Sequence, residues 1–285
     1  ALASLESCLL PGELWDFSEN NLKNTHGFDW SHCSGGNAFM ATAYLARWGG
    51  PVSESDDPYD PDSGNSPLAL PVRKHVQEVL FLARDPNEAK WAVWNHGALA
   101  CSYYHSSDEQ YFNPTYNAYY YNGSATTNHE VAIVGWDDNY PGARFKIPPP
   151  ANGAWIVKNS WGAGWGSGGF FTIAYGSARI GTDTGFVSAW MNYDSSGGLL
   201  HYDEAGMNDT VGWAGSKTDW GLAAFTPPRN TRATRVEFWT TDATTDVDLY
   251  VYDTFDGNSP TGLLWSQLNL SYNEAGYHSV PINPS

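Results

Sequence analysis

The apolar positions follow a helical period early in the chain and a strand period later. Leu2, Leu5 and Leu9 recur at helical spacing, and Pro11-Gly12 ends this run. A second such pattern fills residues 37–48 between two glycine pairs. Residues 86–96 predict a third helix, because proline stands at its start and histidine at its end. Short apolar runs predict strands at 98–104, 131–136, 155–158 and 170–175. Helices first and strands second predict an α+β fold.

The residue composition changes at Asp194, which two serines and two glycines follow. This stretch predicts a linker at 195–199 between two domains, 1–194 and 200–285. In the second domain residues 246–253 alternate cleanly between apolar and polar positions, as a strand does. We therefore expect a small all-β sandwich. No clear closing strand precedes residue 285, which leaves truncation at this end open.

Charge and composition limit the partners. The 285 residues carry 14 basic and 31 acidic side chains, a net charge of −17 that disfavours nucleic acid. No apolar run is long enough for a membrane-spanning helix. The histidines show no metal-ligand spacing, and we predict neither metal nor cofactor. The acidic residues of the loop 53–67 do not follow the helix–loop–helix calcium order, so we expect a solvated surface loop.

Two segments bear the candidate chemistry, NHEVAIVGWDD at 128–138 and VKNSWGAGWGSGG at 157–169. A histidine at the start of a strand, His129, is a candidate general base, and such a base needs a group that holds its ring. The amide oxygen of Asn159 can accept from one ring nitrogen and leave the other for a nucleophile. A neutral amide suffices when that nucleophile is a thiol. Trp161 is then placed to shield this hydrogen bond from water.

These two segments resemble the histidine and asparagine regions of papain-like cysteine peptidases. FSENNL at 17–22 and HCSGGNAFMATAYLARWGGPVSESDDPY at 32–59 resemble further segments of that family, so the likeness covers roughly residues 1–190. It implies a papain-like fold and a polypeptide substrate. His129 would be the base, Asn159 its orienting partner and Trp161 the shield.

The same resemblance implies three substrate-binding residues. Gly35 and Gly36 would offer backbone groups to an extended peptide, much as an added strand does. Leu99 would line the pocket for the second residue before the cut.

One family feature is missing from the chain. The family's nucleophile lies in a Gln…Cys-Gly-Ser-Cys-Trp-Ala-Phe region, and nothing in residues 1–285 matches it. The family places its histidine about 130 residues after the cysteine, which puts the expected nucleophile about five residues ahead of Ala1. Cys8, Cys33 and Cys101 do not occupy its position. We therefore expect a fragment that is inactive by itself, and the usual disulfide partner of Cys33 to be missing as well.

The C-terminal region resembles the lectin-like β-sandwich of some microbial papain-like peptidases. That likeness implies a secreted or cell-surface protein tethered to a surface or glycan. A second hypothesis is a pseudo-peptidase that serves as a binding or adhesion module. Serine, glycine or alanine at the nucleophile position would favour it, whereas the joint presence of His129, Asn159 and Trp161 argues against it.

Overall fold

The computed structural model describes residues 1–9, 12–177, 179–203, 206–207 and 215–282, and the chain divides into two compact units. Unit one contains residues 1–19, 36–38 and 80–188, and unit two contains 20–35, 39–79 and 189–285. The predicted linker at 195–199 begins within a turn in which Gly197 N donates to Asp194 O (3.2 Å). A domain boundary at this linker stays a prediction.

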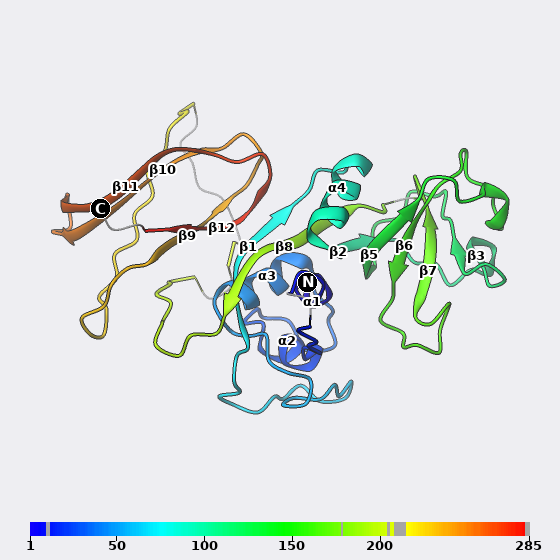
Figure 1. Cartoon of the computed structure of the whole chain (residues 1–285), viewed down its shortest axis with the longest axis horizontal. Coiled ribbons are helices and arrows are strands. Elements are labelled where there is room, and N and C mark those ends of the chain that lie inside the picture. The colour runs from blue at the N-terminus through cyan, green and yellow to red at the C-terminus, as the bar shows by residue number, and fades with distance from the viewer. Residues whose placement is uncertain (10–11, 178, 204–205, 208–214, 283–285) are drawn as a thin grey trace. The chain divides into compact units, whose positions relative to one another are not determined.

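Unit one is built on a mainly antiparallel sheet with the strand order β3-β4-β7-β6-β5-β2-β8 (Figure 1). Only β4 and β7 pair in parallel among the pairings described for this unit. The four strands predicted for this region are confirmed, whereas β3, β4 and β8 had no clear signal. The bounds are β2 (Leu99–Tyr103), β3 (Phe112–Asn113), β4 (Ala118–Tyr119), β5 (His129–Asp137), β6 (Ala154–Lys158), β7 (Phe170–Ala174) and β8 (Thr182–Asn192).

The core of unit one lies against this sheet. Leu99, Ile133, Val157 and Ile173 come from four neighbouring strands and have no exposed surface. The helix α4 (Pro86–His96) packs on β5 and β2, as Figure 1 shows. Its predicted bounds are confirmed.

The termini of α4 show why the sequence predicts it so well. The side chain of Asp85 accepts from Asn87 N (2.7 Å) and caps the first turn. Pro86 stands at the first helical position, where a missing N–H costs nothing. Gly97 ends the helix with φ +93°, which a residue with a side chain rarely adopts.

Unit one also contains α1 (Leu2–Ser7) and two short 3₁₀ helices, η1 (Glu109–Tyr111) and η2 (Gly142–Arg144). Leu2 and Leu5 of the predicted helical pattern lie in α1 and are buried. The helix ends before Leu9, and its predicted stop at Pro11 lies outside the described residues. Across the described part of the chain, no helix has the length and apolarity to cross a membrane.

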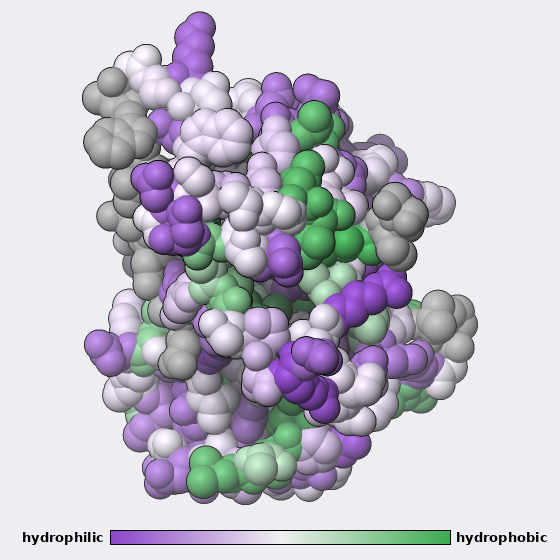
Figure 2. Space-filling model, turned by 90° about the vertical axis from the view of Figure 1, so that its left-hand side faces the viewer, coloured by the Kyte–Doolittle hydropathy of each residue, from purple (hydrophilic) through white to green (hydrophobic). Residues whose placement is uncertain are grey.

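Unit two holds the second helical pattern and the C-terminal strands. β1, β12 and β9 are neighbours in one sheet, and β10 pairs with β11 in a separate two-stranded sheet, so the C-terminal strands belong to two sheets. Leu263, Leu264 and Leu268 of β11 are exposed, and Figure 2 shows apolar patches on the face it views. The bounds are α2 (Glu19–Thr25), α3 (Ala38–Ala46), β1 (Lys74–Phe81), β9 (Arg235–Thr240), β10 (Asp246–Phe255), β11 (Pro260–Ser271) and β12 (Ala275–Pro281).

The acidic loop of unit two is not solvated throughout, which corrects the sequence prediction. Asp57 is only 3% exposed. Its two carboxylate oxygens accept from Asn20 Nδ2 (2.8 Å) and Asn21 Nδ2 (3.0 Å) of α2. A buried carboxylate needs such donors to replace its lost hydration, so this residue anchors the loop to the helix.

Candidate active site

Antiparallel pairing brings His129 and Asn159 to the same edge of the sheet. β5 begins at His129, and β6 ends at Lys158, which pairs with Ala132. In antiparallel neighbours the start of one strand lies beside the end of the other. His129 Nε2 lies 2.8 Å from Asn159 Oδ1 although 30 positions separate them in the chain.

A second hydrogen bond fixes the orientation of the Asn159 amide. Ser160 N donates to Asn159 Oδ1 (2.9 Å), so the atom that faces both groups must be an acceptor. His129 Nε2 must then carry a hydrogen, which leaves Nδ1 as the ring nitrogen that can take a proton from another group. Asn159 is 5% exposed, and its Nδ2 is buried with no hydrogen-bond partner in the described part of the chain.

The glycine-rich loop 159–169 returns on itself and presents Trp161. Asn159 N donates to Gly169 O (2.9 Å), which closes the loop at its base. Gly166 has φ +60°, and a Cβ there would lie 2.5 Å from Phe170 O. Only glycine fits this position, because the close backbone approach leaves no room for a side chain.

Trp161 covers one face of His129. The two ring centroids lie 5.1 Å apart at an interplanar angle of 32°. Trp165 meets the Trp161 ring edge-on at 4.8 Å and stacks on Phe112 at 5.6 Å. Trp161 remains 42% exposed, so it is a lid between the imidazole and solvent rather than a core residue.

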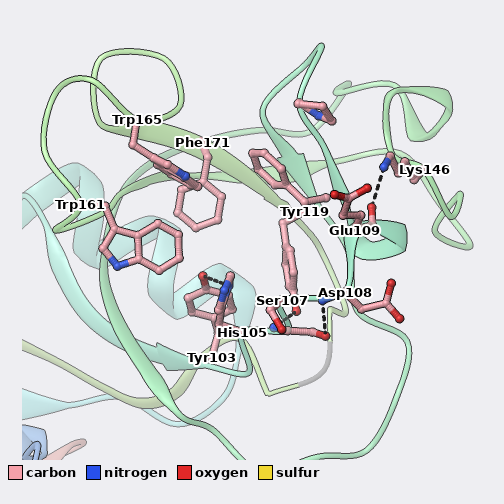
Figure 3. Close-up of a pocket in the computed structure, with 13 residues that line it drawn as sticks. Tyr103, His105, Ser107, Asp108, Glu109, Tyr119, Lys146, Trp161, Trp165 and Phe171 are labelled. Carbon is pink, nitrogen blue, oxygen red and sulfur yellow. Dashed lines mark hydrogen bonds between the residues drawn. The ribbon is translucent and has the colours of Figure 1, made fainter.

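A cavity of about 370 Å³ opens beside Trp161 (Figure 3). Asp108, Glu109 and Lys146 contribute charged groups to its wall, and Lys146 Nζ donates to Glu109 O (2.7 Å). In the close-up Trp161, Trp165 and Phe171 lie on one side and Tyr119 on the other. Aromatic rings thus dominate the wall, and they include Tyr103, Phe112, Tyr119, Trp161, Trp165 and Phe171.

The predicted substrate-binding residues differ in exposure: the two glycines lie at the surface, and Leu99 is buried. Gly35 and Gly36 are exposed, and a Cβ added at Gly35 would meet no atom within 4 Å. Their backbone groups are therefore accessible. Leu99 is 0% exposed, pairs with Ile133 and belongs to the core of unit one, so its side chain does not reach a surface.

Cys8 and Cys101 lack the environment of a nucleophile. Cys101 is buried in β2, and burial raises the pKa of its thiol to about 12. Cys8 is half-buried at the end of α1, where its Sγ donates to Leu5 O (3.1 Å). Cys33 is exposed and belongs to unit two. A search of the described residues finds no group of three or more His, Cys, Asp or Glu side chains that could hold a metal ion.

No pattern in the sequence indicated a second histidine near this pair. His105 lies in the cavity wall, and its ring meets the Trp161 ring edge-on at 4.9 Å. It stands alone in a loop of serines and acidic residues, without a motif or a metal-like spacing. Only the tertiary structure shows that it lies beside His129.

Comparisons with known proteins agree with this geometry. Residues 1–190 match the model of the papain family cysteine proteases. A solved structure of the clostridial cysteine protease Cwp84 after propeptide cleavage is 30% identical, with a TM-score of 0.83, over 99% of this chain and 73% of that one. A structure of the cysteine protease and lectin-like domains of Cwp84, a surface-layer-associated protein of Clostridium difficile, is 28% identical, with a TM-score of 0.82, over 99% and 65%.

The match to a curated relative covers a smaller part of both chains. A probable cysteine protease of Arabidopsis thaliana is 33% identical over 165 residues, which is 54% of this chain and 42% of the plant protein. The chain therefore spans less than half of that relative. Together the comparisons confirm the predicted papain-like α+β fold.

Proposed function

Because this chain belongs to the papain family of cysteine proteases, we propose that residues 1–190 form most of a cysteine-type endopeptidase site in which His129 is the base. The observation that supports this role is the 2.8 Å contact of His129 Nε2 with Asn159 Oδ1. It fixes the ring and leaves Nδ1 for a thiol. A general base needs this combination of orientation and a free nitrogen.

The reaction follows from that tautomer. His129 Nδ1 takes the proton of a cysteine thiol, and the thiolate attacks the peptide carbonyl carbon. The imidazolium then gives the proton to the departing amine, which leaves a thioester. Water hydrolyses the thioester with His129 again as base, which restores the thiol. Asn159 holds the ring through both proton transfers, and a thiolate–imidazolium pair is stable without a buried carboxylate.

Trp161 is proposed to keep water from the His129–Asn159 hydrogen bond, and its position over the imidazole supports this role. Gly35 and Gly36 are proposed to pair with the backbone of an extended substrate, which their exposure allows. We propose no direct substrate contact for Leu99, because its side chain lies in the core and has no exposed surface.

The attacking thiol is proposed to come from a cysteine outside residues 1–285. Cys101 is buried with a raised pKa, and a thiol in that state is a poor nucleophile. The test reads the coding sequence ahead of Ala1 and assays the longer product with a fluorogenic peptide. A cysteine about five residues upstream is expected, at the family's spacing. Serine, glycine or alanine at that position would instead favour the pseudo-peptidase hypothesis.

The role of His129 has a matched control in the same chain. In the longer product that carries the nucleophile, replacing His129 by alanine is expected to lower kcat/KM by at least about 10²–10⁴-fold, the usual contribution of a general base. His201 is an exposed histidine of unit two, and His201→Ala is expected to keep full activity. Equal activity of the two variants would remove His129 from the mechanism.

The C-terminal region is proposed to be a lectin-like module that tethers a secreted or cell-surface enzyme to a glycan. The match to the Cwp84 structure that contains protease and lectin-like domains, over 99% of this chain, supports this. Trp220 is 77% exposed and lies 5.9 Å from the Tyr250 ring, and exposed aromatic rings are suited to stack on sugars. Binding of the 285-residue chain to a glycan array, weakened in Trp220→Ala, is expected; an array without any signal would contradict the tether.

A further inference from the structure

His105 is tied to the residue that precedes the catalytic base. It lies two residues beyond β2, and its backbone N donates to Asn128 Oδ1 (2.7 Å). Asn128 Nδ2 donates back to His105 O (2.9 Å). This pair of hydrogen bonds fixes the His105 backbone against the start of β5, where His129 follows Asn128 directly.

The ring of His105 is held between aromatic neighbours. It meets Trp161 edge-on at 4.9 Å and lies 6.1 Å from the His129 ring. On its other side it stacks on Tyr119 at 6.1 Å and 28°. Tyr103 Oη lies 3.4 Å from His105 Nδ1. Trp161 therefore contacts both imidazoles, and His105 contributes to the packing that keeps Trp161 over His129.

The His129 ring is close enough to affect the charge of His105. Burial lowers the pKa of His105, and the neighbouring His129 lowers it further. The other titratable groups around the ring are the phenols of Tyr103 and Tyr119, whose pKa values burial raises. They therefore stay neutral at ordinary pH.

Charged groups farther along the cavity wall have mixed signs. They are the carboxylates of Asp108 and Glu109 and the ammonium of Lys146. Asp108 is already engaged by Gln110 N (3.0 Å) and Gln110 Nε2 (2.5 Å). Among the described contacts of the His105 ring, the neighbour that can carry a positive charge is thus His129.

We propose that His105 is a positioning residue of the peptidase site, which as a neutral ring holds Trp161 over His129 and whose protonation opposes the protonated state of His129. The inference rests on the proposed role of His129 as base. A thiolate–imidazolium pair needs a protonated catalytic histidine, so the site works with His105 neutral. Acidification that protonates His105 would place a second positive charge beside this imidazolium.

The test uses the 285-residue chain and does not depend on activity. The titration of the His105 ring is followed by NMR, with its signal assigned from His105→Gln. In His129→Gln the neighbouring charge is gone, and the His105 midpoint is expected to rise by about half a unit to one unit, the Coulomb effect at 6 Å in an effective dielectric of about 40–80. His201→Gln is the control and is expected to leave the midpoint unchanged. An unchanged midpoint in His129→Gln overturns the proposal.

A second variant separates charge from packing. His105→Phe keeps a flat ring but cannot be protonated, whereas His105→Ala removes both. The indole N–H signal of Trp161, assigned from Trp161→Phe, is expected to stay in place in His105→Phe and to shift in His105→Ala. A shift of the same size in both variants, or in neither, would show that His105 does not hold Trp161. Loss of peptidase activity without these NMR changes would concern the proposed function alone.

Discussion

Replacing Trp161 by alanine tests whether a half-exposed tryptophan stabilises the catalytic loop. The side chain contacts three rings, His129 at 5.1 Å, His105 at 4.9 Å and Trp165 at 4.8 Å. It is 42% exposed, so a little over half of its surface is buried. An exposed aromatic without such contacts would contribute little. The variant therefore distinguishes a lid from an ordinary surface residue.

The size of the effect follows from the buried surface. A large aromatic side chain buries about 150–250 Å² when it is fully covered, so Trp161 buries roughly 90–150 Å². At about 25 cal/mol per Å² this corresponds to about 2–4 kcal/mol. We expect that cost to appear as local opening of the loop 159–169, because the lost contact with His129 joins this loop to β5. The His129–Asn159 hydrogen bond would then be exposed to water.

Hydrogen exchange read by mass spectrometry measures this opening directly. Peptides covering 159–169 in Trp161→Ala are expected to exchange about 30-fold faster or more, the ratio that about 2 kcal/mol gives. The control is Trp94→Ala, because Trp94 is 82% exposed on α4 and its loss should change protection there by less than about 0.5 kcal/mol. Equal protection of the loop in wild type and Trp161→Ala would refute the reasoning.

Three further changes test other parts of unit one. Asn159→Ala removes the acceptor for His129 Nε2 and Ser160 N, so in the peptidase assay we expect kcat to fall more than KM rises, and a parallel loss in both would contradict an orienting role. Leu99→Ala leaves a cavity in a fully buried position and is expected to cost about 2–5 kcal/mol in urea unfolding; a cost below about 1 kcal/mol would argue against its core position. Burial raises the pKa of Glu6, whose Oε1 accepts from Phe17 N (3.0 Å), so this group stabilises the fold below its unfolded pKa and less as pH rises through the folded one. Glu6→Gln should therefore be most favourable relative to wild type near neutral pH, and an advantage confined to acidic pH would reverse the sign.

The sequence predicted the parts of the site that depend on local chemistry. The helix α4 has its cap, proline and glycine in the chain itself, and β5 and β6 are continuous apolar runs that end at polar residues. His129 and Asn159 were predicted as partners because one orients the other chemically. Their antiparallel register then places them in hydrogen-bonding contact.

Other features depend on contacts that no local pattern encodes. β3 and β4 have two residues each, too short for a periodic signal. In the sequence Asp57 resembles the other acidic residues of a surface loop. The two asparagines of α2 donate hydrogen bonds to its carboxylate and so offset the cost of burying it. The expected role of Leu99 depended on which face of a strand meets a cleft, a choice that the pleat of β2 decides.

The register between β5 and β6 determines where insertions can occur without disturbing the catalytic pair. The alignment of His129 with Asn159 is set by the ladder of these strands, and residues 138–153 join them without taking part in that ladder. Doubling the length of a flexible connection costs only about 0.6 kcal/mol in closure entropy. Insertions at exposed positions of this connection, away from the buried Tyr140 and Phe145, can therefore accumulate without moving the catalytic pair. A single-residue slip in the ladder, by contrast, would turn one partner to the opposite face. The connection is thus a region where new surface can evolve while the chemistry stays aligned.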